Sequence, residues 1–249
     1  MDEMELMMQL HLNNNRQGPG SEEATNLAIT LTGIDKKKSY KIADIGCGTG
    51  GQTISLAKTL QGEIVAVDLF EEFLDRLKDN SKNENISAHI ETLSASMDKL
   101  PFEKEEFDII WSEGAVYNIG FKYGINYWKD FIKPGGILAV SELSWITNSR
   151  PKELEDFWNG EYSEMDTISG KIRVLEEAGY KVLGHFILSD DCWLDNYYIP
   201  LLDSHKDFMK KFYDNETARM IVERDIKEVN FYKKYKDFYS YGFYIAQKI

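Results

Sequence analysis

The sequence predicts a single α/β domain built on a doubly wound, mostly parallel β-sheet. Three observations predict this fold class. At residues 41–60, a short apolar run leads into a glycine-rich turn and then into a helical pattern. Further short apolar runs alternate with segments whose apolar residues recur at helical spacing. The chain has 249 residues, a length at which one α/β domain with additions is common.

The first strand and its turn carry the strongest signal. Ile42, Ala43 and Ile45 form an apolar run suited to a strand that is buried on both faces. Three glycines follow within five residues, and glycine permits positive φ and lets a ligand approach the backbone closely. Residues 52–60 are predicted to form the helix that leaves this turn. The segment is therefore interpreted as a nucleotide-binding turn.

An acidic residue follows the second predicted strand, residues 64–67. This residue, Asp68, stands 22 positions after Gly46, and dinucleotide-binding folds place a ribose-binding acid about 20 residues after the first glycine. Gly46, Gly48 and Gly51 also match the spacing G-x-G-x-x-G, although that match is weak evidence by itself. We expect the Asp68 carboxylate to bind two ribose hydroxyl groups.

The remaining elements follow from the period of the apolar residues. The N-terminal segment 4–12 is predicted to be a helix whose methionines fill gaps in the core, and Ser21 should cap a second helix. Further strands are predicted at residues 86–90, 107–111, 137–140, 180–188 and 241–249. Further helices are predicted at residues 71–80, 168–178, 195–212 with an interruption at Pro200, and 216–235. Residues 127–131 are predicted to end another helix, and Pro151 suits the first turn of one more.

Five blocks occur in order between about residues 40 and 145. They are residues 44–50 (Asp-Ile-Gly-Cys-Gly-Thr-Gly), Asp68, residues 96–102 (Ser-Met-Asp-Lys-Leu-Pro-Phe), residues 107–110 (Phe-Asp-Ile-Ile) and residues 133–136 (Lys-Pro-Gly-Gly). On these blocks the chain resembles the class I S-adenosylmethionine (SAM) methyltransferases, particularly the small-molecule group that includes the ubiquinone and menaquinone biosynthesis enzymes. The resemblance implies a Rossmann-like sheet of seven strands whose last strand is antiparallel. It also implies SAM as cofactor, S-adenosylhomocysteine (SAH) as its product, and in-line methyl transfer to a small-molecule acceptor.

The same resemblance implies which residues hold the cofactor. Asp68 would bind the ribose, the turn from Asp44 to Gly50 the methionine and sugar, and Ser96 with Met97 the adenine. An N-terminal arm folded over the cofactor would make Arg16 a further contact, and an ordinary turn between two helices is the alternative. The expected cofactor-binding residues are Asp44, Gly46, Cys47, Gly48, Gly50, Asp68, Leu69, Ser96, Met97, Glu113 and Arg16.

Candidates for chemistry and for substrate binding lie further along the chain. Glu113 follows the fourth strand, at the edge where open α/β sheets bind ligands. Three roles are open for its side chain: to contact the cofactor, to contact the substrate, or to cap the next helix. If the acceptor needs a general base, Glu113 and Tyr117 are the nearest candidates. Trp193, Tyr197 and Tyr198 begin a long insertion before the last strand and are expected to face the substrate.

One methyltransferase domain is expected over residues 1–249. It would comprise an N-terminal helical arm at residues 1–36, a SAM-binding core at 37–147 and a C-terminal half at 148–249. The last part contains the helical insertion at about residues 190–238.

Composition limits the partners. The net charge of −13 and the pI of about 4.8 disfavour nucleic acid, which proteins bind largely through Lys and Arg. Two cysteines, one of them inside the glycine turn, favour a reduced, cytoplasmic setting. No zinc-ligand spacing, secretory signal or membrane-spanning run is recognised, so no metal and no membrane partner are expected. A homodimer is one option for an oligomeric state that the sequence leaves open.

Two other functions fit parts of the pattern. The spacing G-x-G-x-x-G together with Asp68 also fits an NAD-dependent oxidoreductase, although no acid–base set for hydride transfer is recognisable. A SAM-binding protein without catalytic activity is the second alternative. Thermal-shift assays with NAD and SAM distinguish the first from a methyltransferase, and transfer of a labelled methyl group distinguishes the second.

Overall fold

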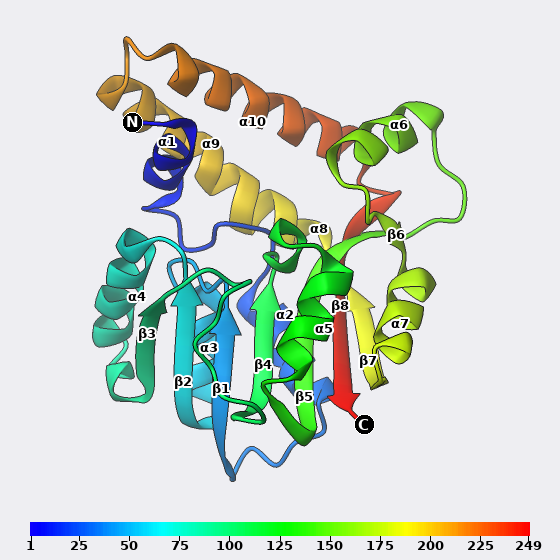
Figure 1. The fold of residues 1–249 in the computed structure, drawn as a ribbon. Helices are drawn as coiled ribbons and strands as arrows, with labels where there is room; N and C mark the ends of the chain where they lie inside the picture. Colours follow the sequence, from blue (N-terminus) through cyan, green and yellow to red (C-terminus); the bar gives the residue numbers. More distant parts are fainter.

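The computed structural model describes residues 1–249, apart from the side chain of Ala88, and Figure 1 shows its fold. The strands are β1 (Ser39–Ile45), β2 (Gln61–Asp68), β3 (Ile90–Ser94), β4 (Phe107–Glu113), β5 (Ile132–Trp145), β6 (Asp166–Thr167), β7 (Tyr180–Ile187) and β8 (Tyr239–Lys248). The helices are α1 (Glu3–His11), α2 (Glu22–Leu31), α3 (Gly51–Thr59), α4 (Glu71–Asn83), α5 (Phe121–Lys129), α6 (Lys152–Glu161), α7 (Ile168–Glu177), α8 (Asp190–Trp193), α9 (Ile199–Lys211) and α10 (Glu216–Tyr235). Three short helical turns are η1 (Ser87–His89), η2 (Val116–Asn118) and η3 (Leu194–Tyr198).

One sheet organises the molecule, with the strand order β3-β2-β1-β4-β5-β8-β7, and β6 pairs with β5 outside this path. Strands β1 to β5 are parallel, whereas β8 runs antiparallel to both β5 and β7. The predicted α/β fold class is confirmed, including the antiparallel last strand. Because β1 and β4 lie next to each other at the centre, the strand order reverses there, and the crevice outside their carboxyl ends is where such sheets bind ligands.

Helices cover both faces of the sheet because successive side chains of a strand point to opposite faces. On one face, Ile42 of β1 belongs to the apolar cluster that includes Ala28 of α2 and Leu56 of α3. On the other face, Ala43 and Ile45 belong to the cluster that includes residues of α5 and α7. Both clusters are buried, and this explains the continuous apolar run of the first strand.

A third group of helices covers the carboxyl ends of the strands. Figure 1 shows α1, α9 and α10 lying across this edge of the sheet, and we call these three helices the helical roof. Arg224 of α10 holds Glu3 of α1 at 2.7 Å, and Lys211 of α9 donates to Gln9 of α1 at 2.6 Å. The N-terminal helix is thereby bound to the two long helices of the C-terminal insertion.

Several predicted boundaries are wrong. The third strand occupies residues 90–94 rather than 86–90, because α4 extends to Asn83 and the chain then forms η1 before it reaches the sheet. The Lys-Pro-Gly-Gly block at residues 133–136 lies within β5 rather than before the strand predicted at residues 137–140; the register against β4 shifts there, and Gly135 takes a φ of +75°. The helix predicted over 195–212 begins at Ile199, with Pro200 in its first turn, and a π-helical turn precedes it. Among the described residues, no helix combines the length and the hydrophobicity that a membrane span requires.

Candidate functional site

A cavity of about 840 Å³ lies between the carboxyl ends of the central strands and the helical roof. It extends from the glycine turn and β2 to η2 and η3. Most of the expected cofactor-binding residues line it: Arg16, Gly46, Cys47, Gly48, Asp68, Leu69, Ser96, Met97 and Glu113. The topology therefore brings together residues that are far apart in the sequence.

The glycine turn has no room for side chains. Gly46 takes a φ of +76°, and a Cβ atom there would lie 2.4 Å from the Cβ of Ala115. Gly48 takes a φ of +56°, and a Cβ atom there would lie 2.0 Å from Oε1 of Gln17. The positive φ and the close contacts both explain why glycine occupies these two positions.

Asp68 holds this turn and still has acceptor capacity. Its Oδ2 accepts the Gly48 N–H at 2.8 Å, and its Oδ1 accepts the Phe70 N–H at 3.1 Å. Burial raises the pKa of Asp68, while the backbone hydrogen bonds act in the opposite direction. Each carboxylate oxygen can accept more than one hydrogen bond, so two hydroxyl groups of a ligand could still bind here.

Asp44 and Gly50 lie outside the cavity lining, contrary to their expected place in the cofactor site. Asp44 is fully buried and accepts hydrogen bonds from Oγ1 of Thr53 at 2.5 Å and from Nε2 of Gln52 at 3.3 Å. Burial raises the pKa of Asp44 to about 7. A Cβ atom at Gly50 would lie 2.1 Å from Cδ1 of Leu77, so this glycine allows contact with α4. Asp44 therefore contacts α3, and Gly50 packs against α4, on the side of the turn that faces away from the cavity.

The segment predicted to hold the adenine lies at the cavity wall. The Oγ of Ser96 donates to Oδ1 of Asp98 at 2.5 Å, and the carbonyl of Met97 accepts the Trp128 indole N–H at 3.0 Å. Asp98 also lines the cavity. The Ser96 hydroxyl and a nearby carboxylate thus form one polar unit, next to the apolar side chain of Met97.

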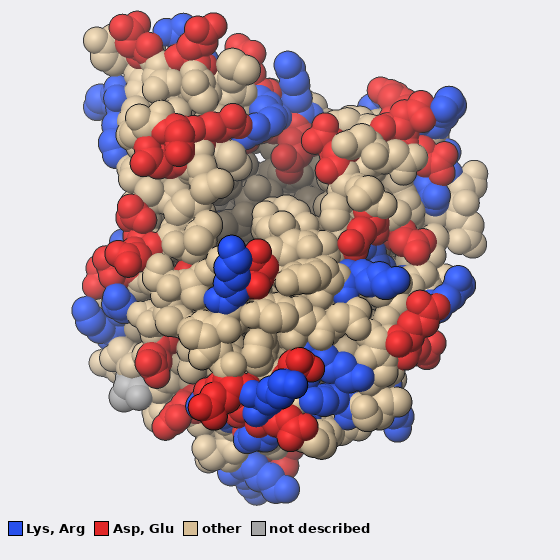
Figure 2. Space-filling view, viewed as in Figure 1, with Lys and Arg blue, Asp and Glu red and all other residues tan. Residues whose placement is uncertain are grey.

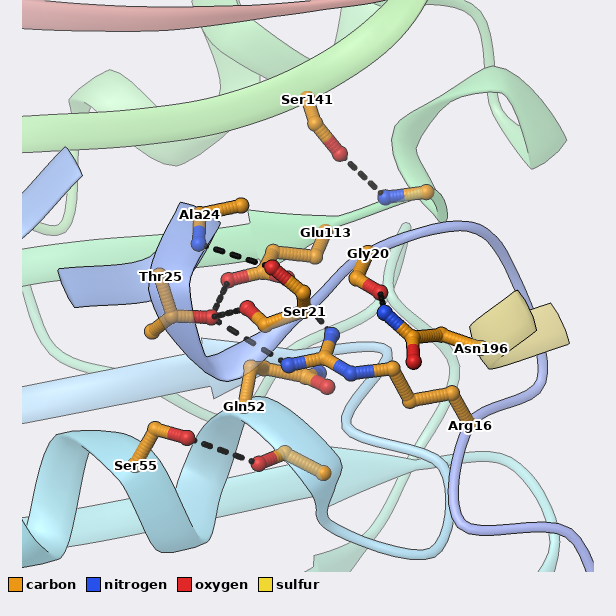
Figure 3. Close-up of polar contacts among 12 residues, drawn as sticks. Arg16, Gly20, Ser21, Ala24, Thr25, Gln52, Ser55, Glu113, Ser141 and Asn196 are labelled. Atoms are coloured by element: carbon orange, nitrogen blue, oxygen red, sulfur yellow. Dashed lines mark hydrogen bonds and ion pairs between the residues drawn. The ribbon is translucent and has the colours of Figure 1, made fainter. Parts of the chain in front are cut away.

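Glu113 is the centre of a buried network, which Figure 3 shows. Its carboxylate pairs with Arg16 at 2.9 Å, and its side chain is only 3% exposed. Its Oε1 also accepts from Oγ1 of Thr25 at 2.7 Å and from Nε1 of Trp111 at 2.9 Å. The helix-cap alternative does not match these contacts. The ion pair and the two further donors occupy both carboxylate oxygens of Glu113.

The N-terminal arm also binds the glycine turn. Oε1 of Gln17 accepts the Thr49 N–H at 2.8 Å, and Nε2 of Gln17 donates to the Asn14 carbonyl at 2.9 Å. Oγ1 of Thr49 donates to the same carbonyl at 2.8 Å. Residues 14–17 therefore lie directly over the glycine turn. The segment is more than an ordinary turn between two helices, which was the alternative that the sequence left open.

The candidate catalytic and substrate residues fall into two groups. Tyr117 and Tyr197 line the cavity, and burial raises the pKa of Tyr117, which favours its protonated form. Trp193 and Tyr198 lie in the core instead, with 4% and 1% exposure. The ring of Trp193 stacks on Tyr232 at 4.5 Å and donates to Ser240. Its expected contact with substrate is therefore corrected, because β8 and α10 enclose it.

Further lining residues were not expected from the sequence. They include Gln17, Gln52, Asp98 and Asn118, and also Met4, Met7, Met8 and His11 of α1. The methionines were predicted to fill the core, yet Met4 and Met7 are 56% and 37% exposed. Their broad apolar face was a usable signal, but the sequence does not say whether such a face meets a core or a cavity.

The comparisons with known proteins agree with this geometry. Residues 42–136 match the family model described as a methyltransferase domain. The ubiquinone/menaquinone biosynthesis C-methyltransferase UbiE of Pseudomonas entomophila is 25% identical over 203 residues, 80% of this chain and 76% of that protein. An uncharacterized protein of Haemophilus influenzae is 28% identical over 191 residues, 68% of this chain and 75% of its own.

A solved structure supports the fold over the whole length. The SAM-dependent methyltransferase of Geobacter sulfurreducens, solved in complex with SAH, superposes with a TM-score of 0.85 over 98% of both chains, at 13% identity. At that identity the likeness supports the fold alone, whereas the domain match and the sequence relatives support the activity. The chain is a class I SAM-dependent methyltransferase that resembles the ubiquinone/menaquinone biosynthesis C-methyltransferases.

Proposed function

We propose that this enzyme transfers the methyl group of SAM to a nucleophilic atom of a small molecule by in-line displacement. The observation that carries the proposal is the Asp68 carboxylate on the wall of a cavity that continues past Glu113 to Tyr117 and Tyr197. One end of this cavity suits a nucleoside, and the other end remains available for an acceptor. The relative named as a C-methyltransferase of ubiquinone and menaquinone biosynthesis also supports a small-molecule acceptor.

The residues present fit SAM. Asp68 can accept hydrogen bonds from two ribose hydroxyls, and the bare backbone at Gly46 and Gly48 allows the close approach that the sugar and the methionine part require. Leu69 and Met97 offer apolar surfaces for the adenine, beside the polar unit of Ser96 and Asp98. When bound, SAM supplies an electrophilic methyl group on a sulfonium leaving group.

The protein then contributes alignment and exclusion of water. Holding the reacting atoms in line can lower a barrier by as much as ~7–11 kcal/mol. The helical roof lies across the carboxyl ends of the strands and residues 14–17 cover the glycine turn, which limits the access of bulk water to the reacting atoms. We assign Glu113 and Arg16 a positioning role, because their mutual ion pair joins the N-terminal arm to the end of β4.

Calorimetry with SAH tests the cofactor site. Asp68→Asn should weaken SAH binding at least tenfold, because the amide offers one acceptor oxygen in place of two and carries no charge. Asp75→Asn is the control, since Asp75 is an exposed residue of α4 paired only with Lys78 in the described contacts. NAD should not bind. Equal SAH affinity of wild type and Asp68→Asn would contradict the ribose assignment, and binding of NAD in place of SAH would favour an oxidoreductase.

A further inference from the structure

His11 ends helix α1 and lines the cavity. Two contacts fix its place. Its ring stacks on that of Tyr197 in η3, with the centroids 6.2 Å apart and the planes 9° from parallel. Its carbonyl accepts a hydrogen bond from Nε2 of Gln17 at 3.2 Å, and Gln17 in turn binds the Thr49 N–H of the glycine turn. His11 therefore lies between the cover of the glycine turn and η3.

This position is the junction between the two ends of the cavity. At the cofactor end, Asp68 and the glycine turn suit the nucleoside and the methionine part of SAM. At the acceptor end, Tyr117 and Tyr197 line the wall. A methyl group that passes from cofactor to acceptor does so where these two ends meet, and a side chain that contacts both sides of the junction is placed beside the transferred group.

The imidazole of His11 is free for a ligand. Among the described residues, the bonds that His11 makes outside its own helix run through its carbonyl, to Gln17 and to the Asn14 N–H. Nδ1 is enclosed by protein and has no partner there. Nε2 is not enclosed in this way, so it is the ring nitrogen that remains open to the cavity. Nearly all buried polar atoms have a partner, and one that lacks it calls for a reason such as a catalytic role.

The other titratable groups on the cavity wall are less suited to accept a proton. The carboxylates are engaged: Glu3 with Arg224, Glu113 with Arg16, Asp98 with Ser96, and Asp68 with the N–H groups of Gly48 and Phe70. Burial raises the pKa of three further groups, so that they keep their protons at neutral pH: Cys47, Tyr117 and Tyr197. Within the described cavity wall, His11 remains as the group that can take a proton.

The charged groups that act on His11 come from the helical roof. Burial lowers the pKa of His11 most, the charge of Asp225 on α10 raises it, and His205 on α9 lowers it. His205 and Asp225 are themselves paired at 3.0 Å. Burial thus favours the neutral ring with its free lone pair, whereas Asp225 stabilises the imidazolium once a proton has been taken up.

We propose that His11 is the general base of the reaction and that its Nε2 accepts the proton carried by the reacting atom of the acceptor. This inference rests on the methyl transfer proposed above and names its acceptor class, a molecule whose reacting atom carries a hydrogen, as in a hydroxyl or N–H group. A carboxylate acceptor would have no proton to give. A positioned base contributes about 10²–10⁴-fold to a rate.

The step balances in atoms and charge. The lone pair of the acceptor atom forms the new bond to the methyl carbon as the C–S bond breaks, and the electrons of that bond remain on sulfur to give SAH. The acceptor proton moves to Nε2 of His11. The positive charge that sulfur carries before the step therefore lies on the imidazolium afterwards. Figure 2 shows a hollow beneath the helical roof, which gives water access to remove this proton before the next turnover.

NMR titration of the histidine rings tests this placement without an acceptor. SAM and SAH differ by one methyl group and one positive charge, so the sulfonium acts as a charged probe of its surroundings. The pKa of His11 should be lower in the SAM complex than in the SAH complex, with a proton affinity about tenfold weaker, because neighbouring positive charges repel each other. His185 is the internal control, since it is exposed on β7 at the edge of the sheet and its pKa should be the same in both complexes. The spectrum of His11→Gln identifies the His11 signal.

His11→Phe separates a base from a structural ring. Phenylalanine keeps an aromatic ring against Tyr197 and removes the enclosed nitrogen that has no partner. His11→Phe should therefore unfold at the same or higher urea concentration as the wild type and keep its SAH affinity. His205→Phe is the matched control in the roof. It should unfold at lower urea concentration, because it leaves the buried Asp225 without its partner.

The outcomes separate this inference from the proposed function. An equal pKa of His11 in the SAM and SAH complexes would overturn the assignment and leave the cofactor site intact. A ring that stays neutral in both complexes wherever the protein is folded would also overturn it, because such a ring is too weak a base. A loss of stability in His11→Phe as large as that in His205→Phe would assign His11 to the structure instead. Failure of the wild type to bind SAM and SAH would contradict the proposed function itself, and the inference with it.

Discussion

A single methyl group added to the glycine turn tests whether that turn must have a bare backbone. The substitution Gly46→Ala adds a Cβ atom that would lie 2.4 Å from the Cβ of Ala115, with φ at +76°. Gly135→Ala is a matched control, because Gly135 has a φ of +75° and the nearest atom to its added Cβ lies 3.9 Å away. The two variants share the conformational strain, and only Gly46→Ala adds a steric clash.

The expected magnitudes follow from these two terms. A left-handed backbone costs a residue with a Cβ atom about 1–2 kcal/mol, so Gly135→Ala should lose about that much stability. The clash at Gly46 adds about 1–3 kcal/mol, the usual cost of inserting a methyl group into a packed site. Since both Gly46 and Ala115 line the cavity, the shift that relieves the clash should also weaken SAH binding at least tenfold, or about 1.4 kcal/mol.

Urea unfolding and calorimetry with SAH measure the two effects separately. Gly46→Ala should unfold at lower urea than Gly135→Ala and bind SAH more weakly, whereas Gly135→Ala should keep the wild-type affinity. Equal stability of the two variants would refute the clash. Wild-type SAH affinity in Gly46→Ala would refute the conclusion that a ligand needs the bare backbone of this turn.

Three predictions concern buried charges. Burial raises the pKa of Asp44 from 3.8 to about 7, so the stability of the wild type should fall by up to about 4 kcal/mol as the pH rises from 3.8 to 7. Urea titrations of Asp44→Asn should not show this loss. Lys171→Met removes the cation beside the buried Glu142 and should destabilise the fold by about 3–5 kcal/mol at pH 8, and by less at pH 5, where the Glu142 carboxyl is protonated. Equal losses of stability at the two pH values would contradict this reasoning. Arg16→Met should weaken SAH binding in calorimetry, because it leaves Glu113 buried without its cation.

The sequence predicted the parts of the site whose chemistry is local. A glycine with positive φ and an acid at the end of a neighbouring strand are fixed by short segments, and Gly46, Gly48 and Asp68 all line the cavity. Asp44 belongs to the same motif but points away from the cavity towards Thr53 of α3. A motif therefore identifies the turn without saying which of its side chains faces the ligand.

The acceptor end could not be predicted in the same way, because its walls come from segments that meet only in the folded chain. Tyr197 and Tyr198 are neighbours in a π-helical turn, yet Tyr197 lines the cavity and Tyr198 is 1% exposed. The direction of each ring depends on how η3 packs against α10.

One buried carboxylate links the two ends of the cavity. Glu113 binds the N-terminal arm through Arg16, α2 through Thr25 and its own strand through Trp111. The same arm contacts the glycine turn through Gln17, which accepts the Thr49 N–H. Because one short segment carries both Arg16 and Gln17, it cannot leave the Glu113 side without disturbing the cover of the glycine turn. The geometry of the cofactor end and that of the acceptor end are thus set by one docking event, and a change to either contact should be measured at both ends.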